Sequence, residues 1–144
     1  MKIGVPKEIK NNESRVGLTP VSVNYLSKLG HSVYVQSNAG QSIGFSDELY
    51  RESGAIILSD AGEVFSTSDL IIKVKEPIQE ELEFLTESHT LFTYLHLAGN
   101  STQAKKLLET GVTGIAYETV TSSDGSLPLL APMSAIAGQL SMVV

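Results

Sequence analysis

The chain has 144 residues, 42% of them hydrophobic, a formal net charge of −6 at pH 7 and no cysteine. This size predicts one globular domain with its own core, and the acidic balance disfavours a general nucleic-acid or anionic-membrane surface. The lack of cysteine excludes disulfides, cysteine-based zinc sites and thiol nucleophiles. The N-terminus has no signal-peptide pattern, and no apolar run approaches the ~20 residues of a membrane helix, so we expect a soluble cytoplasmic protein.

Short strands and helices alternate along the chain. Runs of β-forming residues predict strands at 3–5, 32–36, 55–58, 70–74, 91–95 and 112–117. Capping residues, proline and glycine predict helices over 19–30, 46–53, 60–66, 79–85 and 101–110, and from residue 132 onward. Strands joined by helical crossovers run parallel, so the pattern indicates an α/β fold with helices on both faces of a parallel sheet of about six strands, Rossmann-like or flavodoxin-like. It leaves the strand order open.

Apolar spacing predicts which helix faces are buried. The first helix has one apolar stripe, predicted to be buried, made of Val21, Tyr25, Leu26 and Leu29. In the helix that Ser101 is expected to cap, the inward residues are Ala104, Leu107 and Leu108. The short acidic helix is expected to present a solvated face of Glu80, Glu81, Glu83 and Glu87. The last helix has an apolar stripe of Met133, Ile136, Ala137, Leu140 and Val144.

Arg15 ends a long polar loop, 7–15, that follows the first strand. Connections after strands usually have two to six residues, and longer polar ones are often functional. A guanidinium fork binds a carboxylate through two parallel hydrogen bonds, which makes Arg15 a candidate anion-binding residue. The alternative is a solvated surface arginine.

Lys73 and Lys75 lie at the end of the strand predicted over 70–74, and their side chains would share one face. Burying an unpaired lysine is costly, so this end of the strand is expected to open onto solvent or an anionic ligand. The alternative is a pair of lysines that extend to the surface at a strand end.

His96 follows the strand predicted over 91–95. The carboxyl ends of parallel strands share one edge of the sheet, where ligands bind, and this rule places Arg15, Lys75 and His96 at the same edge. Two cations and an imidazole suit a small carboxylate that carries a carbonyl or an amine, with the imidazole moving the proton. The alternative for His96 is a packing residue held by hydrogen bonds.

Two further segments are informative. The glycine-containing loop 38–44 lacks the G-x-G-x-x-G spacing of a dinucleotide loop and is interpreted as a turn. The last helix stops at Val144 in the middle of its apolar pattern, without a glycine or a basic last turn. This ending indicates a longer protein cut at this point, and a frayed natural terminus is the alternative.

Five segments, in this order, closely resemble the N-terminal part of bacterial alanine dehydrogenases: GVPKE (4–8), NNESRV (11–16), LIIKVKEP (70–77), TYLHLA (93–98) and LPLLAPMS (127–134). The resemblance extends over the whole chain. The related proton-translocating transhydrogenases share the opening segment and the strand with Lys75. They typically lack a histidine at the position of His96 and the PLLAPMS run, so they rank second.

The resemblance implies an NAD-dependent oxidative deamination of L-alanine to pyruvate and ammonium. By analogy Arg15 binds the substrate carboxylate, and Lys75 contacts the carboxylate or the carbonyl oxygen. His96 is the proton donor and acceptor while the imine forms and hydrolyses. Ser134 lies where the family contacts NAD from the substrate side, and Met133 lines the same cleft. The resemblance implies no metal.

The resemblance also implies a domain plan. Residues 1–131 correspond to the substrate-binding catalytic domain, and residues 132–144 to the start of the interdomain connector helix. The family's Rossmann domain, which binds NAD and supplies a catalytic aspartate, has no counterpart in this sequence. The chain alone is therefore expected to be inactive or nearly so. Full-length relatives form hexamers. The alternative is a remnant that binds carboxylates or a partner without catalysis.

Overall fold

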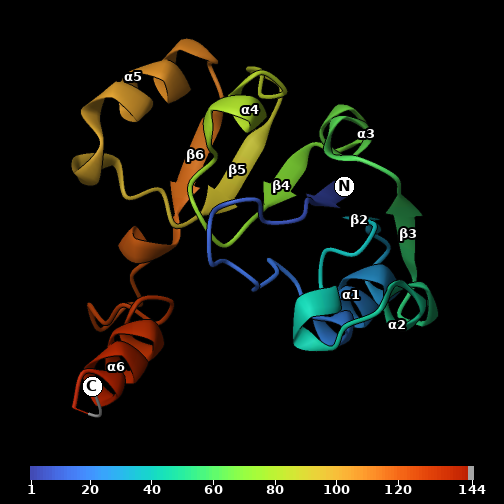
Figure 1. Ribbon diagram of the computed structural model, residues 1–144, viewed down its shortest axis with the longest axis horizontal. Coiled ribbons are helices and arrows are strands. Elements are labelled where there is room, and N and C mark those ends of the chain that lie inside the picture. The colour runs from blue at the N-terminus through green and yellow to red at the C-terminus, as the bar shows by residue number, and fades with distance from the viewer. Residues whose placement is uncertain (143–144) are drawn as a thin grey trace.

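The structure is a computed structural model that describes residues 1–142 (Figure 1). The strands are β1 (Lys2–Val5), β2 (Ser32–Gln36), β3 (Ala55–Leu58), β4 (Leu70–Ile72), β5 (Thr90–Thr93) and β6 (Thr113–Ala116). The α-helices are α1 (Pro20–Lys28), α2 (Asp47–Glu52), α3 (Ala61–Thr67), α4 (Gln79–Leu82), α5 (Ser101–Glu109) and α6 (Ala131–Leu140). Three 3₁₀ turns complete the list: η1 (Gln41–Ile43), η2 (Leu97–Gly99) and η3 (Tyr117–Thr119).

All six strands are parallel and lie in the order β3-β2-β1-β4-β5-β6. The predicted α/β fold is therefore confirmed. β1 occupies the centre, where Ile3 pairs with Val33 of β2 on one side and Leu70 of β4 on the other. The direction of winding reverses here, because β2 and β3 extend to one side and β4, β5 and β6 to the other. In open α/β sheets, ligands bind beyond the carboxyl ends of the strands at this reversal.

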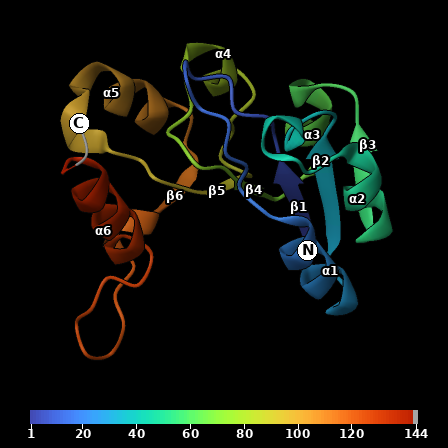
Figure 2. The ribbon, with the colours of Figure 1, turned by 60° about the horizontal axis from the view of Figure 1, so that its bottom comes forward.

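Helices cover both faces of the sheet (Figure 2). One core joins β1, β2 and β3 to α1 and α2, and its buried members include Val5, Val35, Val23 and Tyr50. The other core joins β4 and β5 to α3, α4 and α5, and includes Phe65, Ile71, Leu91 and Leu107. Successive residues Ile71 and Ile72 of β4 belong to opposite cores, as the alternation of a strand requires.

The loop that carries Arg15 is held against the sheet at its far end. The Tyr50 hydroxyl donates a hydrogen bond to the carbonyl oxygen of Leu18 (2.7 Å), and burial raises the pKa of Tyr50 to about 12. Gly17 packs so closely on β4 that a Cβ there would lie 2.5 Å from the carbonyl oxygen of Ile72. Both contacts fix the path of the chain between Arg15 and α1.

The buried face predicted for the first helix was wrong for three of its four residues and right for Leu26. Val21, Tyr25 and Leu29 are 80%, 66% and 58% exposed, whereas Val23 is fully buried and Leu26 packs against the core. The helix carries two apolar stripes, and the pattern does not show which one meets the sheet. Exposed apolar residues are common on single domains, so the outward stripe by itself indicates no partner.

Two smaller predictions about helices were also wrong. Leu108 of α5 is 79% exposed, although Leu107 is buried as expected. The N-cap of α5 is Asn100 rather than Ser101, since the Asn100 side chain accepts a hydrogen bond from the Gln103 amide (3.1 Å).

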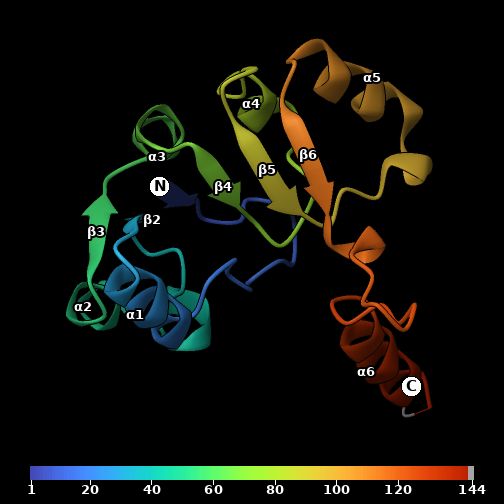
Figure 3. The same cartoon turned by 180° about the vertical axis from the view of Figure 1, so that it is seen from behind.

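Helix α6 stands apart from the sheet, beyond β6 (Figures 1 and 3). None of its residues is buried, and Ile136 and Leu140 are 53% and 61% exposed. Val144, the last member of its predicted stripe, lies outside the described residues. No helix within residues 1–142 combines the length and apolarity needed to cross a membrane.

Candidate active site

Arg15, Lys75 and His96 follow β1, β4 and β5, which are neighbours at the centre of the sheet. Each residue lies beyond the carboxyl end of its strand. The strand order, which the sequence left open, therefore gathers the three candidates at the edge where the winding reverses.

Arg15 is held by Glu13, two residues earlier. Its Nε and Nη2 atoms donate to the two carboxylate oxygens of Glu13 at 2.8 and 2.6 Å, a bidentate pair. This hydrogen-bonded guanidinium lowers the pKa of Glu13 from its ordinary value, against the effect of burial. The Nη1 atom points elsewhere and lies 3.9 Å from the Met133 sulfur. Glu13 therefore occupies one edge of the guanidinium and leaves the Nη1 edge towards Met133.

Arg15 borders a cavity of about 440 Å³ whose walls are mainly apolar and aromatic. The other lining residues include Phe45, Phe92, Tyr94, Tyr117, Leu129 and Met133. Tyr94 is fixed by donating a hydrogen bond from its hydroxyl to the Leu129 carbonyl oxygen (2.5 Å) and by edge-to-face packing on Tyr117. Thr19 and Lys73 also line it, but the Lys73 ammonium is paired with Glu8 and Glu81, so Arg15 supplies the available cation in a mainly apolar cavity. This lining suits a small ligand with a carboxylate and an apolar substituent.

Lys73 is not a surface or ligand-facing lysine, so the expectation of an open strand end was wrong for it. Its ammonium is fully buried and donates to Glu81 (2.5 Å) and Glu8 (3.2 Å). Glu81 was expected on a solvated face and is buried instead, and burial raises its pKa despite the opposing charge of Lys73. β4 ends at Ile72, but the Lys73 amide still donates to the Phe92 carbonyl oxygen of β5 (3.1 Å), so Lys73 stays beside the sheet, where its ammonium meets Glu8 and Glu81 rather than solvent.

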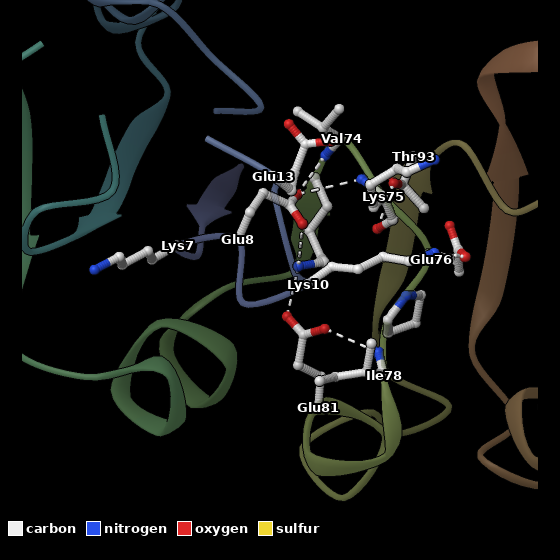
Figure 4. Close-up of polar contacts among 12 residues, drawn as sticks. Lys7, Glu8, Lys10, Glu13, Val74, Lys75, Glu76, Ile78, Glu81 and Thr93 are labelled. Carbon is white, nitrogen blue, oxygen red and sulfur yellow. Dashed lines mark hydrogen bonds and ion pairs between the residues drawn. The ribbon is translucent and has the colours of Figure 1, made fainter. Parts of the chain in front are cut away.

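Lys75 is positioned through its backbone. Glu8 accepts hydrogen bonds from the amides of Val74 (2.6 Å) and Lys75 (3.3 Å), and the Thr93 hydroxyl donates to the Lys75 carbonyl oxygen (3.0 Å). Figure 4 shows the Glu8 carboxylate reaching this backbone. The buried carboxylate of Glu8 and the Thr93 hydroxyl of β5 therefore fix the backbone of Lys75.

The Lys75 ammonium makes no ion pair with any carboxylate of residues 1–142. Its charge still affects the carboxyl groups of Glu13 and Glu76. The pKa of Glu13 is lowered chiefly by its hydrogen bond with Arg15. Burial would raise the pKa of Glu76, but the hydrogen bond from Lys10 helps to lower it. The charge of Lys75 adds a smaller lowering to both pKa values. An ammonium without a counter-ion, between two carboxylates that are already paired, is available to an anionic ligand.

His96 is exposed and has a left-handed backbone conformation, with φ 46°. Its amide donates to Glu118 (2.7 Å), and it borders a second cavity of about 340 Å³ with Gly99, Asn100 and the paired Lys10 and Glu76. His96 and Arg15 therefore face separate cavities in this structure. Among the other predicted site residues, Met133 joins Arg15. Lys75 and the exposed Ser134 line neither cavity.

The family model for the alanine dehydrogenase/PNT N-terminal domain matches residues 4–137. The chain belongs to this family. Its relatives include the alanine dehydrogenases of Methanococcus maripaludis, 54% identical over 142 residues, and of Mycolicibacterium smegmatis, 49% identical over 144 residues. These alignments cover 99% and 100% of this chain but only 38% and 39% of the relatives.

Solved structures give the same result for the fold. An L-alanine dehydrogenase matches 98% of this chain with a TM-score of 0.93 and 48% identity, and the match covers 39% of that chain. A transhydrogenase from Sinorhizobium meliloti matches 82% of this chain with a TM-score of 0.76 and 27% identity, covering 35% of its own length. Within the alanine dehydrogenase/PNT family, this chain is thus more similar in sequence and structure to these dehydrogenases than to that transhydrogenase.

Three site residues were not identified from the sequence as part of the site: Glu8, Glu13 and Glu118. Glu118 follows β6, so the same rule about carboxyl ends places it at the same edge. Glu13 lies in the loop of Arg15. No comparable signal marks Glu8, because its partners Val74 and Lys73 are more than 60 residues away in sequence.

Proposed function

We propose that this chain is the substrate-binding part of an NAD-dependent L-alanine dehydrogenase, which converts L-alanine to pyruvate and ammonium. Residues 1–131 are the substrate-binding domain and residues 132–144 begin the connector to an NAD-binding domain. The observation that carries the proposal is the arrangement of Arg15, Lys75 and His96 beyond three adjacent strands, in a chain about half identical to alanine dehydrogenases.

Each residue has a role that follows from its chemistry. The Nη1 edge of Arg15 and the unpaired ammonium of Lys75 hold the substrate carboxylate. Lys75 also contacts the carbonyl oxygen, where it stabilises developing negative charge. His96 accepts and returns the proton at the substrate nitrogen and carbonyl oxygen. Because His96 and Arg15 line separate cavities and Lys75 follows β4, which lies between β1 and β5, the substrate would lie across these three strand ends.

NAD would supply the hydride acceptor that oxidation at the substrate α-carbon requires. Residues 1–142 offer it one wall only, since they contain no G-x-G-x-x-G phosphate loop. Ser134 fits a contact with the cofactor because its side chain is exposed at the start of α6. Met133 would line the same cleft, with its sulfur 3.9 Å from the Nη1 atom of Arg15.

A first test measures substrate binding by the 144-residue chain. Pyruvate is titrated into isotopically labelled protein, and the amides of Arg15 and Lys75 and the His96 ring are followed by NMR. We expect saturable shifts concentrated at these three residues. Acetone, which has the carbonyl and methyl groups without the carboxylate, is the control and should leave them unchanged. A well-folded chain that shows no localised shift with pyruvate would contradict the assignment of the binding site.

Replacing Arg15 by lysine tests its role as the carboxylate anchor. Lysine keeps the charge but cannot bind with two parallel N–H groups, so the loss of about 1.5–3 kcal/mol of charge-assisted hydrogen bonding is expected to weaken pyruvate binding by about tenfold to a hundredfold. The matched control is Arg51→Lys, at an exposed arginine that pairs with Glu48 on α2. Equal pyruvate affinities for the two variants would remove Arg15 from the binding site.

A further inference from the structure

We propose that Glu118 and Gly99 are positioning residues for His96: Glu118 holds its backbone in the left-handed conformation, and Gly99 leaves room for its ring. This inference rests on the proposed function, because it concerns the group that transfers the proton. Glu118 follows the end of the neighbouring strand β6, and Gly99 lies in the turn η2 that follows His96. Together they fix where the imidazole lies.

The backbone of His96 is the unusual feature. Its φ and ψ are 46° and 38°, in the left-handed region that residues with a Cβ seldom adopt. Among residues 1–142, the other non-glycine residues with positive φ are Asn12 and Asn38, and asparagine and histidine adopt this region more often than most residues with a Cβ. A strained conformation persists only where its surroundings enforce it, and such residues cluster at functional sites.

Glu118 supplies the enforcing contact. One of its carboxylate oxygens accepts the amide of His96 (2.7 Å), and the other accepts the amide of Leu95 (3.3 Å). Hydrogen bonds from backbone amides to a charged carboxylate are stronger than neutral ones. Two successive amides bound to one carboxylate turn the chain sharply where β5 ends, and this turn directs the His96 side chain.

The sheet itself fixes Glu118. β5 and β6 pair in parallel up to Thr93 and Ala116, and Glu118 is only two residues beyond that last pair. The left-handed conformation of His96 is therefore set by sheet register, through a side chain from the adjacent strand end. Glu118 does not need to contact substrate to affect the reaction.

Gly99 acts on the ring. A Cβ at this position would lie 2.5 Å from the His96 Cδ2 and 2.7 Å from its Nε2, closer than any real contact. The turn η2 brings Gly99 back under His96, since the Gly99 amide donates to the His96 carbonyl oxygen (3.0 Å). No positive φ requires glycine here, so the missing side chain serves the imidazole rather than the backbone.

The two residues predict different NMR signatures in the 144-residue chain. Glu118→Ala should move His96 out of the left-handed region, which changes its amide shift and its HN–Hα coupling, and should also shift the ring signals. Glu118→Gln keeps one acceptor oxygen and should retain part of the native conformation. Gly99→Ala should shift the ring signals while the His96 HN–Hα coupling stays native. Glu52→Gln, at an exposed glutamate of α2, is the control and should change none of them.

The consequence for catalysis is measured in a fusion enzyme, in which residues 1–137 replace the matching segment of the Methanococcus maripaludis alanine dehydrogenase. A misplaced catalytic group costs on the order of a hundredfold in rate. Glu118→Ala should therefore lower kcat by about a hundredfold with little change in the KM for pyruvate, and Glu118→Gln should restore part of the loss. A purely structural role would lower kcat no more than it lowers the amount of folded enzyme.

The outcomes separate this inference from the proposed function. Native His96 coupling and ring signals in Glu118→Ala and Gly99→Ala would overturn the positioning roles, whatever the enzyme's activity. Altered His96 signals without any loss of kcat in the fusion enzyme would also overturn them, because the geometry would then not matter for proton transfer. Normal turnover after replacement of His96 itself would instead overturn the proposed function.

Discussion

Replacing His96 by asparagine in the fusion enzyme is expected to lower kcat by about 10²–10⁴-fold, the range that a positioned general acid or base supplies. Asparagine suits this test because it tolerates the left-handed backbone that His96 adopts and offers no group that titrates near neutral pH. Initial rates for alanine oxidation and pyruvate reduction measure the loss.

Two further variants make this result specific. His96→Ala should lose as much activity and, in addition, some local order, because alanine is less tolerant of positive φ than asparagine. His31→Asn, directly before β2 at the opposite edge of the sheet, should keep its turnover. The chain with His96→Asn should still bind pyruvate through Arg15 and Lys75. Near-normal kcat in His96→Asn would show that another group moves the proton.

The fold was predictable where local signals decide it. Thr19 and Ser46, the first residues of two predicted helix ranges, are the N-caps, since each side chain accepts a hydrogen bond from the amide three residues later, of Ser22 and Leu49. The alternation of strands and helices then leaves a parallel sheet as the regular solution. Strand order and the buried face of α1 were not predictable, because they depend on contacts between segments distant in sequence. Val21 and Val23 are equally apolar, and only the docked sheet distinguishes them.

The same division applies to the site. The rule that carboxyl ends of parallel strands share an edge placed Arg15, Lys75 and His96 together before any strand order was known. It did not show that the Arg15 and His96 cavities are separate, because this depends on side-chain direction. Lys73 was misassigned for a related reason: its partners Glu8 and Glu81 come from another loop and another helix, so local spacing contains no sign of its burial.

Replacing Lys73 by methionine is expected to lower the free energy of unfolding by about 3–5 kcal/mol, the usual cost of removing one partner from a buried ion pair. The side chain is fully buried between Glu8 and Glu81, so its loss leaves two carboxylates without a cation in the interior. Such a loss is a large share of the stability of an ordinary domain. Urea unfolding of the 144-residue chain, followed by circular dichroism, measures it. Lys105→Met, at an exposed lysine of α5, should stay within about 0.5 kcal/mol of the parent.

The pH dependence identifies unpaired charge as the cause. The pKa of Glu81 is already raised by burial, so the folded chain binds its proton more tightly than the unfolded chain, and stability falls as pH rises through that pKa. Removing Lys73 takes away the charge that lowers the pKa of Glu81, so that pKa rises further. The loss of unfolding free energy in Lys73→Met should therefore shrink as the pH is lowered through the raised pKa of Glu81, because protonation removes that buried charge. A deficit that stays constant with pH would instead indicate lost packing. Adding Glu8→Gln and Glu81→Gln should recover most of the stability at neutral pH, because no buried charge then remains.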